Sequence, residues 1–437
     1  MKTRNGRTLK RRVGLWSATL SGTGVIVGAG IYALIGEASG LAGNAAWLGF
    51  LLAAVVAALT AISYARMGRR IPKDSPEFQY ARVGLGLRSG FVAGWLMVWA
   101  DIASAAAVAL GFGGYLHALV GTPAMLAAFG LLVVLSLVAW FGILESILLV
   151  SLLSLVEIGG LLLVVAVGIP HWGEQPLLEA SGGPLGVWSA AALVFFAYLG
   201  FDELGNLAEE MRRPERDLPA AITMAVVIST ILYVLVAVSA VSLVGWQALA
   251  ASSAPLASAV EAALGPQGKS ALAIIALGAT ANTVLLLLVS ASRSLFGMAR
   301  AGALPQPLGW IGIRHTPWVS VALAGVVGSL FLALGDIARV AQITNFTTLT
   351  AFGMVNLSLA VVLRKESKVG GVRRPLVGVV TLLQPLLAFF TCVWLLVMTG
   401  WVAAAFGALL GITGFAVGGW VEHYQRRKQR GAASSGS

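Results

Sequence analysis

Long apolar blocks follow one another along almost the whole of this chain. Because a helix rises 1.5 Å per residue, about 20 apolar residues are enough to cross the roughly 30 Å hydrocarbon layer of a membrane. The chain is 58% apolar and only 11% charged, which excludes a water-soluble protein. The pattern predicts twelve membrane-spanning helices, near residues 13–39, 44–66, 89–116, 122–142, 146–169, 187–208, 217–245, 270–298, 317–335, 339–363, 375–398 and 401–423.

The basic residues are distributed unevenly between the connections of these spans. Lys and Arg exceed Asp and Glu by 11, and nearly all of them fall in alternate connections and at the two ends of the chain. The opposite connections hold only Lys269 and Arg339. Basic residues concentrate on the cytoplasmic side of membrane proteins, so we expect a multi-pass protein of the cell membrane with both termini in the cytoplasm. The distribution therefore reflects topology and disfavours nucleic-acid binding.

Two spans carry sequences that favour a break near the middle of the membrane. The first span holds four glycines between Ser21 and Ile31, and the sixth contains Phe195-Phe-Ala-Tyr-Leu-Gly-Phe-Asp202. The two sites lie five spans apart, in the first and the sixth span, so they occupy corresponding positions in two five-helix halves. This is the pattern of an inverted-repeat transporter. The alternative is that the glycines serve close packing between helices.

Five motifs give the chain a resemblance to a known family. They are Gly28-Ala-Gly-Ile-Tyr32, the sixth-span motif continuing into 208–219, Ser292-Arg-Ser-Leu-Phe-Gly-Met-Ala-Arg-Ala-Gly-Ala-Leu-Pro305, Ile62-Ser-Tyr-Ala-Arg-Met-Gly-Arg-Arg-Ile-Pro72 and Gly94-Trp-Leu-Met-Val-Trp-Ala-Asp101. Together they resemble the amino acid–polyamine–organocation transporters, closely over spans one to eight and in pattern only beyond. The resemblance implies a ten-helix inverted-repeat core followed by two helices, working by alternating access.

The predicted fold is therefore an all-α integral membrane protein with a 5+5 inverted repeat, broken helices one and six, and two C-terminal helices. Connections between spans are too short for a soluble catalytic domain. We infer no cofactor and no obligatory protein partner. The predicted divisions are a basic N-terminus at 1–12, the two halves at 13–169 and 187–363, helices eleven and twelve at 375–423, and a cytoplasmic tail at 424–437.

The broken helices form the predicted substrate site. Unwound backbone leaves N–H and C=O groups that need partners in a membrane, and the carboxylate and ammonium of an amino acid supply them. Phe196 and Phe201 are candidate aromatic gates, with plain packing as the alternative. The resemblance implies that the substrate contacts are Ile26, Gly28, Ala29 and Gly30 in span one, and Phe196, Ala197 and Leu199 in span six.

Glu157 is the strongest functional candidate among the charged residues inside the predicted spans. A charge at the centre of a membrane helix costs at least ~2.5–3.5 kcal/mol, so such a residue is a functional hypothesis. Proton-coupled members of the resembled family often carry a lysine at this place in span five. We expect Glu157 to exchange a proton. The alternative is a neutral side chain with a purely structural role, hydrogen-bonded to a carbonyl. Asp202, just past the break in span six, is a second proton-coupling candidate.

Other polar residues in the spans leave the coupling ion open. Ser290 and Ser292 are possible sodium ligands, so sodium is not excluded, although such hydroxyls often bond to their own backbone. Asp101 and Arg293 are a possible ion pair. No Cys/His cluster has the spacing of a metal site.

The sequence thus predicts a secondary active transporter, or permease, for amino acids, with proton symport preferred. A polyamine or cationic amino acid carrier, an exchanger, and a channel or substrate-sensing receptor on the same helices remain alternatives. An enzyme is disfavoured because no nucleophile–base or metalloprotease motif is present. The identity of the amino acid and the residues from spans three, eight and ten stay open.

Overall fold

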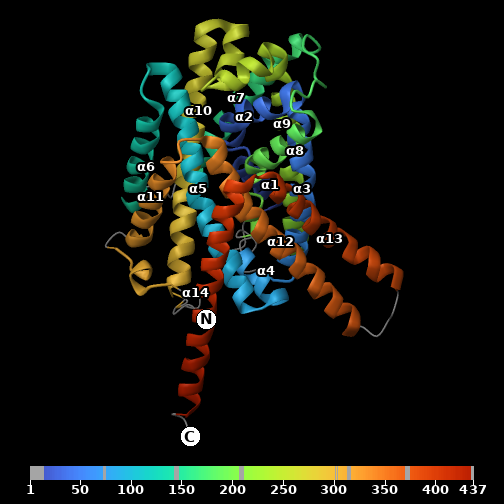
Figure 1. Ribbon diagram of the computed structural model, residues 1–437, viewed down its shortest axis with the longest axis vertical. Helices are drawn as coiled ribbons and strands as arrows, with labels where there is room; N and C mark the ends of the chain where they lie inside the picture. Colours follow the sequence, from blue (N-terminus) through green and yellow to red (C-terminus); the bar gives the residue numbers. More distant parts are fainter. Residues whose placement is uncertain are drawn as a thin grey trace.

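The computed structural model describes residues 14–71, 75–141, 147–205, 211–300, 302, 304–312, 316–369 and 375–434 (Figure 1). Every regular element in these ranges is a helix, which confirms an all-α protein. The α-helices are α1 (Leu15–Ile26), α2 (Gly30–Ala42), α3 (Ala46–Gly68), α4 (Pro76–Leu85), α5 (Leu87–Val120), α6 (Ala124–Phe141), α7 (Ile147–Gly168), α8 (Gly183–Val194), α9 (Pro214–Ala251), α10 (Pro255–Arg300), α11 (Trp318–Leu332), α12 (Ile337–Val369), α13 (Pro375–Met398) and α14 (Trp401–Ser434).

Nine stretches of the described chain are long and apolar enough to cross a membrane. The number is below twelve partly because α1 has only 12 residues and α11 only 15. In addition, α2 and α3 join into one continuous stretch, Gly30–Gly68. Nine such stretches identify a multi-pass membrane protein, while the count of twelve remains a prediction.

Helix α5 lies at the centre of the packing. It contacts α10 and α12 along much of its length and also packs against α4 and α6. Its buried face is made largely of alanine and glycine, including the run Ala105–Ala109. A Cβ added to Gly113 would meet the carbonyl oxygen of Ala124 on α6. Small residues therefore let the helices around α5 approach closely, as is common in membrane bundles.

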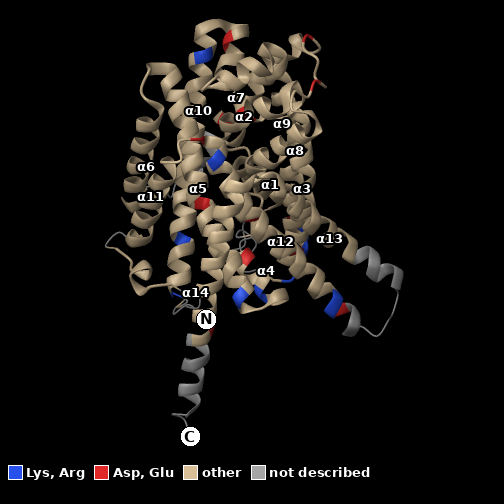
Figure 2. Cartoon of the chain, in the orientation of Figure 1, with Lys and Arg blue, Asp and Glu red and all other residues tan. Residues whose placement is uncertain are grey.

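Figure 2 shows that Lys and Arg positions gather at the end of the molecule that holds α4. The end of α3, the α4 helix and the start of α5 carry Arg66, Arg69, Arg70, Arg82 and Arg88. Lys269 lies in the early part of α10. In Figure 1 this part of the helix lies at the end of the molecule opposite to α4. The charge distribution along the helices is therefore polarised from one end of the bundle to the other.

Candidate functional site

The first predicted span breaks after Ile26. Helix α1 ends there, α2 begins at Gly30, and Val27 has the non-helical angles φ −76° and ψ 42°. The backbone N–H of Val27 still bonds to the carbonyl of Thr23, and that of Ala33 bonds to the carbonyl of Ala29. The glycine-rich sequence thus yields two half-helices with a short turn between them, as predicted.

The sixth predicted span breaks in the same manner. Helix α8 ends at Val194 and a 3-10 turn, η3 (Phe195–Tyr198), follows it. Leu199 is extended, with ψ 146°, and Gly200 has a φ of 113°, a left-handed conformation that favours glycine. A second 3-10 turn, η4 (Asp202–Gly205), completes the break. The non-helical segment around Leu199 therefore depends on the glycine that follows it.

The two breaks lie against each other. A Cβ on Gly30 would stand 2.6 Å from the Cα of Ala197, which is closer than real Cβ atoms approach. A Cβ on Gly200 would stand 2.7 Å from a side-chain carbon of Val25. Ile26, Ala29, Phe196 and Ala197 are all buried. The structure thus brings the predicted contact residues of span one beside those of span six.

Tyr233 of α9 connects the two breaks. Its hydroxyl lies 2.6 Å from the carbonyl oxygen of Ile26 and 2.9 Å from that of Ala197. One hydroxyl hydrogen therefore serves two carbonyls, one from each break. Tyr233 was not predicted, although a tyrosine inside an apolar span is itself a signal, because a buried hydroxyl requires a hydrogen-bond partner.

Thr283 of α10 completes the polar contacts of the first break. Its hydroxyl oxygen accepts the backbone N–H of Ala29 at 3.3 Å, and a Cβ on Gly28 would stand 2.9 Å from the same oxygen. Ser292 instead donates to the carbonyl of Val289 on its own helix. Ser290 bonds to Asp101, away from this break. The α10 hydroxyl beside span one is therefore Thr283 rather than either predicted serine.

Glu157 is 1% exposed on α7. The Nδ2 group of Asn282 donates to Glu157 Oε1 at 3.4 Å, while Glu157 Oε2 has no hydrogen-bond partner among the described residues. The hydroxyl of Tyr32 donates to the backbone carbonyl of Glu157 at 2.7 Å. Asn282 precedes Thr283, so consecutive residues of α10 link Glu157 to the first break. Asn282 was not predicted, because an amide inside a span gives no sign of its partner.

A second group of acidic side chains, the acidic cluster, consists of Glu77, Asp101, Asp202 and Glu203. The Ser290 hydroxyl lies 2.9 Å from Asp101 Oδ2 and 3.3 Å from Glu203 Oε1. Asp202 accepts the N–H of Gly200 at 3.0 Å, so this predicted proton site also caps the break. Arg293 is exposed on α10, and the bond described for Asp101 runs to Ser290, not to Arg293.

Glu77 extends the acidic cluster outside the apolar spans, on α4. It is buried and accepts a hydrogen bond from the Tyr64 hydroxyl at 2.9 Å. Burial, followed by the nearby charge of Asp202, raises the pKa of Glu77 from 4.5 to about 8. Glu77 was not predicted, because the sequence gives no sign that a carboxyl on this short helix is buried.

The two candidate gates have different surroundings. Phe201 packs against Tyr64 and Phe352, with ring centroids 5.6 Å and 5.2 Å away. Phe196 lies instead in an apolar cluster with Ala29 and with buried residues of α5, α10 and α12. That cluster includes Ala106 of predicted span three, Val284 and Leu288 of span eight, and Ala341 of span ten.

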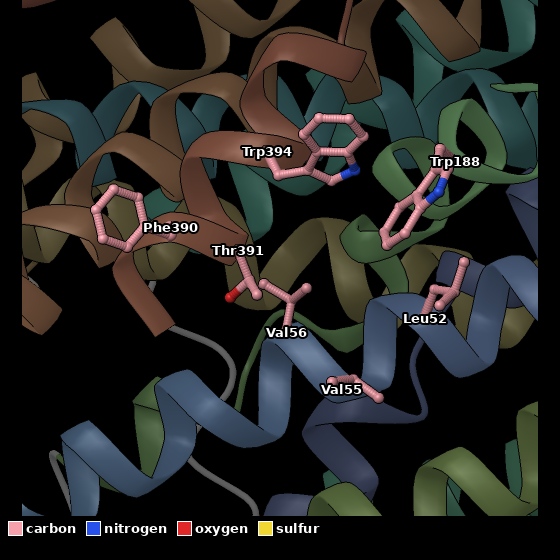
Figure 3. Close-up of a pocket in the computed structure, with 7 residues that line it drawn as sticks. All are labelled: Leu52, Val55, Val56, Trp188, Phe390, Thr391 and Trp394. Atoms are coloured by element: carbon pink, nitrogen blue, oxygen red, sulfur yellow. The ribbon is translucent and has the colours of Figure 1, made fainter. Parts of the chain in front are cut away.

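An apolar groove of about 260 Å³ lies elsewhere, between α3, α8 and α13 (Figure 3). Its side chains include Val55, Trp188, Phe390 and Trp394, and the Thr391 hydroxyl bonds to its own helix. Val55 and Phe390 are strongly exposed, as expected of a surface that faces lipid. Without a charged lining residue, this groove does not suit a zwitterion, and none of its lining residues belongs to either break.

Residues 17–417 match the family described as amino acid permease. The chain is 30% identical over 428 residues to a branched-chain amino acid permease of Bacillus subtilis, covering 91% of this chain and 90% of that protein. It is 31% identical over 424 residues to the methylthioribose transporter of the same species, covering 89% and 88%. It is also 31% identical over 373 residues to the vacuolar cationic amino acid transporter 4 of Arabidopsis thaliana, covering 78% and 61%.

These matches confirm the resemblance and the prediction that the chain is no enzyme, since the family and the relatives are transporters. They agree with a bundle of apolar helices in which two spans are each interrupted and the two breaks lie side by side. The chain belongs to the amino acid permease family and is a multi-pass membrane transporter of amino acids.

Proposed function

We propose that the chain is a secondary active carrier that takes an amino acid through alternating access, with the broken spans as its binding site. The observation that carries this proposal is the single Tyr233 hydroxyl between the carbonyls of Ile26 and Ala197. Carbonyls freed from a helix require donors, and the α-ammonium of an amino acid has three hydrogens to offer. The ammonium satisfies both carbonyls, which a phenol can satisfy only in part.

The other end of the substrate meets the start of α2. The first N–H groups of a helix have no partner within it, and the helix dipole favours a negative charge there. Gly30 leaves the backbone at this end without a side chain. In this proposal the carboxylate binds the α2 N-terminus, and Ile26, Gly28, Ala29, Gly30, Phe196, Ala197 and Leu199 surround the zwitterion.

The coupling ion in this proposal is a proton, carried by Glu157. Its side chain is buried and accepts a long hydrogen bond from Asn282. The next residue of α10 is Thr283, whose hydroxyl accepts the backbone N–H of Ala29 at the first break. A neutral carboxyl is inexpensive to hold in a membrane, whereas an ionised one requires water or a cation. Protonation of Glu157 is thereby linked to the arrangement of span one. Asp202, which caps the second break, is the further proton-exchanging group.

The orientation proposed is that of the charge pattern, with both termini in the cytoplasm of the cell membrane. The end of the bundle that holds α4 carries the arginines of α3, α4 and α5 and is then the cytoplasmic end. The two halves, 13–169 and 187–363, supply the two breaks. Helices α13 and α14 lie outside this repeat.

Transport into proteoliposomes tests the coupling. We expect the native protein to accumulate substrate when the outside is made acidic, without sodium. Glu157→Gln mimics the protonated state, so it is expected to bind and exchange substrate but not to concentrate it. Glu174→Gln, at an exposed carboxyl, is the matched control and keeps accumulation. Accumulation by the Glu157→Gln variant under a pH step, or by the native protein only with sodium, contradicts proton coupling through Glu157.

A cationic substrate is the second candidate, and the acidic cluster favours it. Glu77 and Asp202 are buried carboxyls, and a relative is named as a cationic amino acid transporter. Competition with decarboxylated amines separates the two candidates. An α-amino acid carrier loses at least about tenfold in affinity, about 1.4 kcal/mol, when the carboxylate is removed. Equal binding of the amines favours a polyamine carrier, and saturable counterflow excludes a channel.

A further inference from the structure

Helix α12 presents one face to the break in span six. Ala341 packs in the apolar cluster that contains Ala29 and Phe196. Three turns later, the ring of Phe352 lies 6.2 Å from Phe195 and 5.2 Å from Phe201. Residues three or four apart share a helix face, so Thr344, Asn345 and Thr348 lie on the face between these two contacts. We name these three residues the polar stripe; all are fully buried.

Asn345 binds the end of α8 directly. Its Nδ2 group donates to the carbonyls of Ala192 and Leu193 at 2.7 Å and 2.8 Å. These carbonyls belong to the last turn of α8, where a helix lacks its own donors. Both amide hydrogens are thereby used. The Oδ1 atom of Asn345 can only accept, and it has no partner among the described residues.

The two threonines of the polar stripe are also without partners in the described structure. Their neighbours on α12 behave differently. Thr347 donates to the carbonyls of Ile343 and Thr344, and Thr350 donates to the carbonyl of Phe346. The hydroxyl of a threonine in a membrane helix usually donates to a backbone carbonyl of the preceding turn. The hydroxyls of the polar stripe are therefore set apart from those on the rest of the same helix.

Buried polar atoms that lack a hydrogen bond are rare in folded proteins because each one costs free energy. Here three such atoms, one from each residue of the polar stripe, lie on one helix face. This face packs against a break whose backbone is not a regular helix. A ligand that carries a donor would satisfy Asn345 Oδ1 and leave the threonine hydroxyls free to donate or accept. None of the three residues of the polar stripe is ionisable, so a charged side chain would be costly beside them.

We infer that the polar stripe is the side-chain subsite of the carrier and that it selects neutral amino acids whose side chain bears a hydroxyl or a carboxamide. The inference rests on the proposed function, since it places the substrate at the break in span six. A site that hydrogen-bonds a substrate hydroxyl rejects the analogue that lacks it, because its polar groups are then left unpaired. An apolar side chain of equal size therefore binds more weakly.

Threonine and valine test this directly, because they have nearly the same shape and differ by one hydroxyl. Affinities are measured by competition against a transported amino acid in proteoliposomes and by thermal shift on the purified full chain. We expect threonine to bind at least about tenfold more tightly than valine. Thr344→Val with Thr348→Val is expected to bring the threonine-to-valine ratio close to one while valine binding is retained. These isosteric variants leave Asn345 and its bonds to α8 in place.

Thr347→Val and Thr350→Val are the matched controls, because their hydroxyls bond to the α12 backbone. Both are expected to keep the native ratio. Native protein that binds valine as tightly as threonine overturns the inference, as does a preference that survives the double substitution. A panel of all twenty amino acids separates the two levels. If none binds, the proposed function fails; if some bind without a preference for hydroxyl or carboxamide side chains, only the subsite fails.

Discussion

At the scale of single residues, the site depends on side chains that stand in for missing backbone partners. Tyr233 donates to one carbonyl of each break, and Thr283 accepts a backbone N–H of the first. Asn345 donates to a carbonyl at the end of α8. Each side chain replaces hydrogen bonds that an unbroken helix would make by itself. A membrane offers no water for this purpose, so these side chains stabilise the breaks.

Tyr233→Phe removes the donor that the two carbonyls share. We expect the empty protein to unfold at a lower temperature, with a loss of about 1–3 kcal/mol, because buried acceptors are left unpaired. The substrate-induced rise in unfolding temperature should exceed that of the native protein, since the ammonium then replaces a bond that is absent. Thermal unfolding with and without substrate provides the measurement.

Tyr115→Phe is the control for this substitution. The Tyr115 hydroxyl, on α5, is also buried, but it donates to the carbonyl of Tyr32 within α2. We expect it to lower the unfolding temperature without enlarging the substrate effect. An equal substrate effect in both variants would show that Tyr233 does not share carbonyls with the ligand.

Gly30→Ala tests the contact between the breaks. The added Cβ meets Ala197 at both Cα and Cβ, so the two spans have to move apart. We expect uptake to fall at least tenfold and the unfolding temperature to drop. The double variant Gly30→Ala with Ala197→Gly removes one of the two contacts and should recover part of the uptake. Gly159→Ala, where nothing lies within 4 Å of the new Cβ, should be silent.

At the scale of elements, the sequence predicted where helices break but not what holds the breaks. Four glycines in span one and Phe195-Phe-Ala-Tyr-Leu-Gly in span six mark backbone that is free to leave the helix. Glu157 could be proposed from the sequence because a lone charge is conspicuous among apolar residues. Tyr233, Asn282 and Asn345 were missed because a neutral polar residue in a span has many possible partners, and the actual ones lie far away in the sequence.

Helix α4 gives the molecule a pH-dependent element. The folded protein raises the pKa of Glu77 from 4.5 to about 8, chiefly by burial and then through Asp202, so the folded state holds a proton that the unfolded state has lost between these values. Stability contributed at this site is present below pH 4.5 and is lost as the pH rises towards 8. We expect the unfolding temperature of the native protein to fall across this range.

Glu77→Gln removes the titrating group while keeping a side chain that can accept from Tyr64. The decline in unfolding temperature between pH 5 and pH 8 should then be shallower than in the native protein. Glu215→Gln, at an exposed position near the start of α9, is the control and should leave the native slope. Parallel curves for Glu77→Gln and the native protein would contradict a proton held by Glu77.

At the scale of the whole molecule, the charge pattern and the order of the spans were readable, because both follow from the membrane as a solvent. The number of spans was less secure. A helix that breaks after 12 residues and one of only 15 residues do not meet the length of a full crossing. Span counting from hydropathy therefore loses accuracy at the interrupted first span and at the short helix α11.

The partners of the first break also fix an order of events during synthesis. Tyr233 follows Ile26 by 207 residues, and Thr283 follows Ala29 by 254. At about 5–20 residues per second, a ribosome needs roughly 10–50 s to make the intervening chain. During this interval the turn after Ile26 is in the membrane without its permanent partners. Nascent chains stalled before residue 233 should therefore be open to water or to translocation factors at this turn, and chains stalled well beyond residue 283 should be closed.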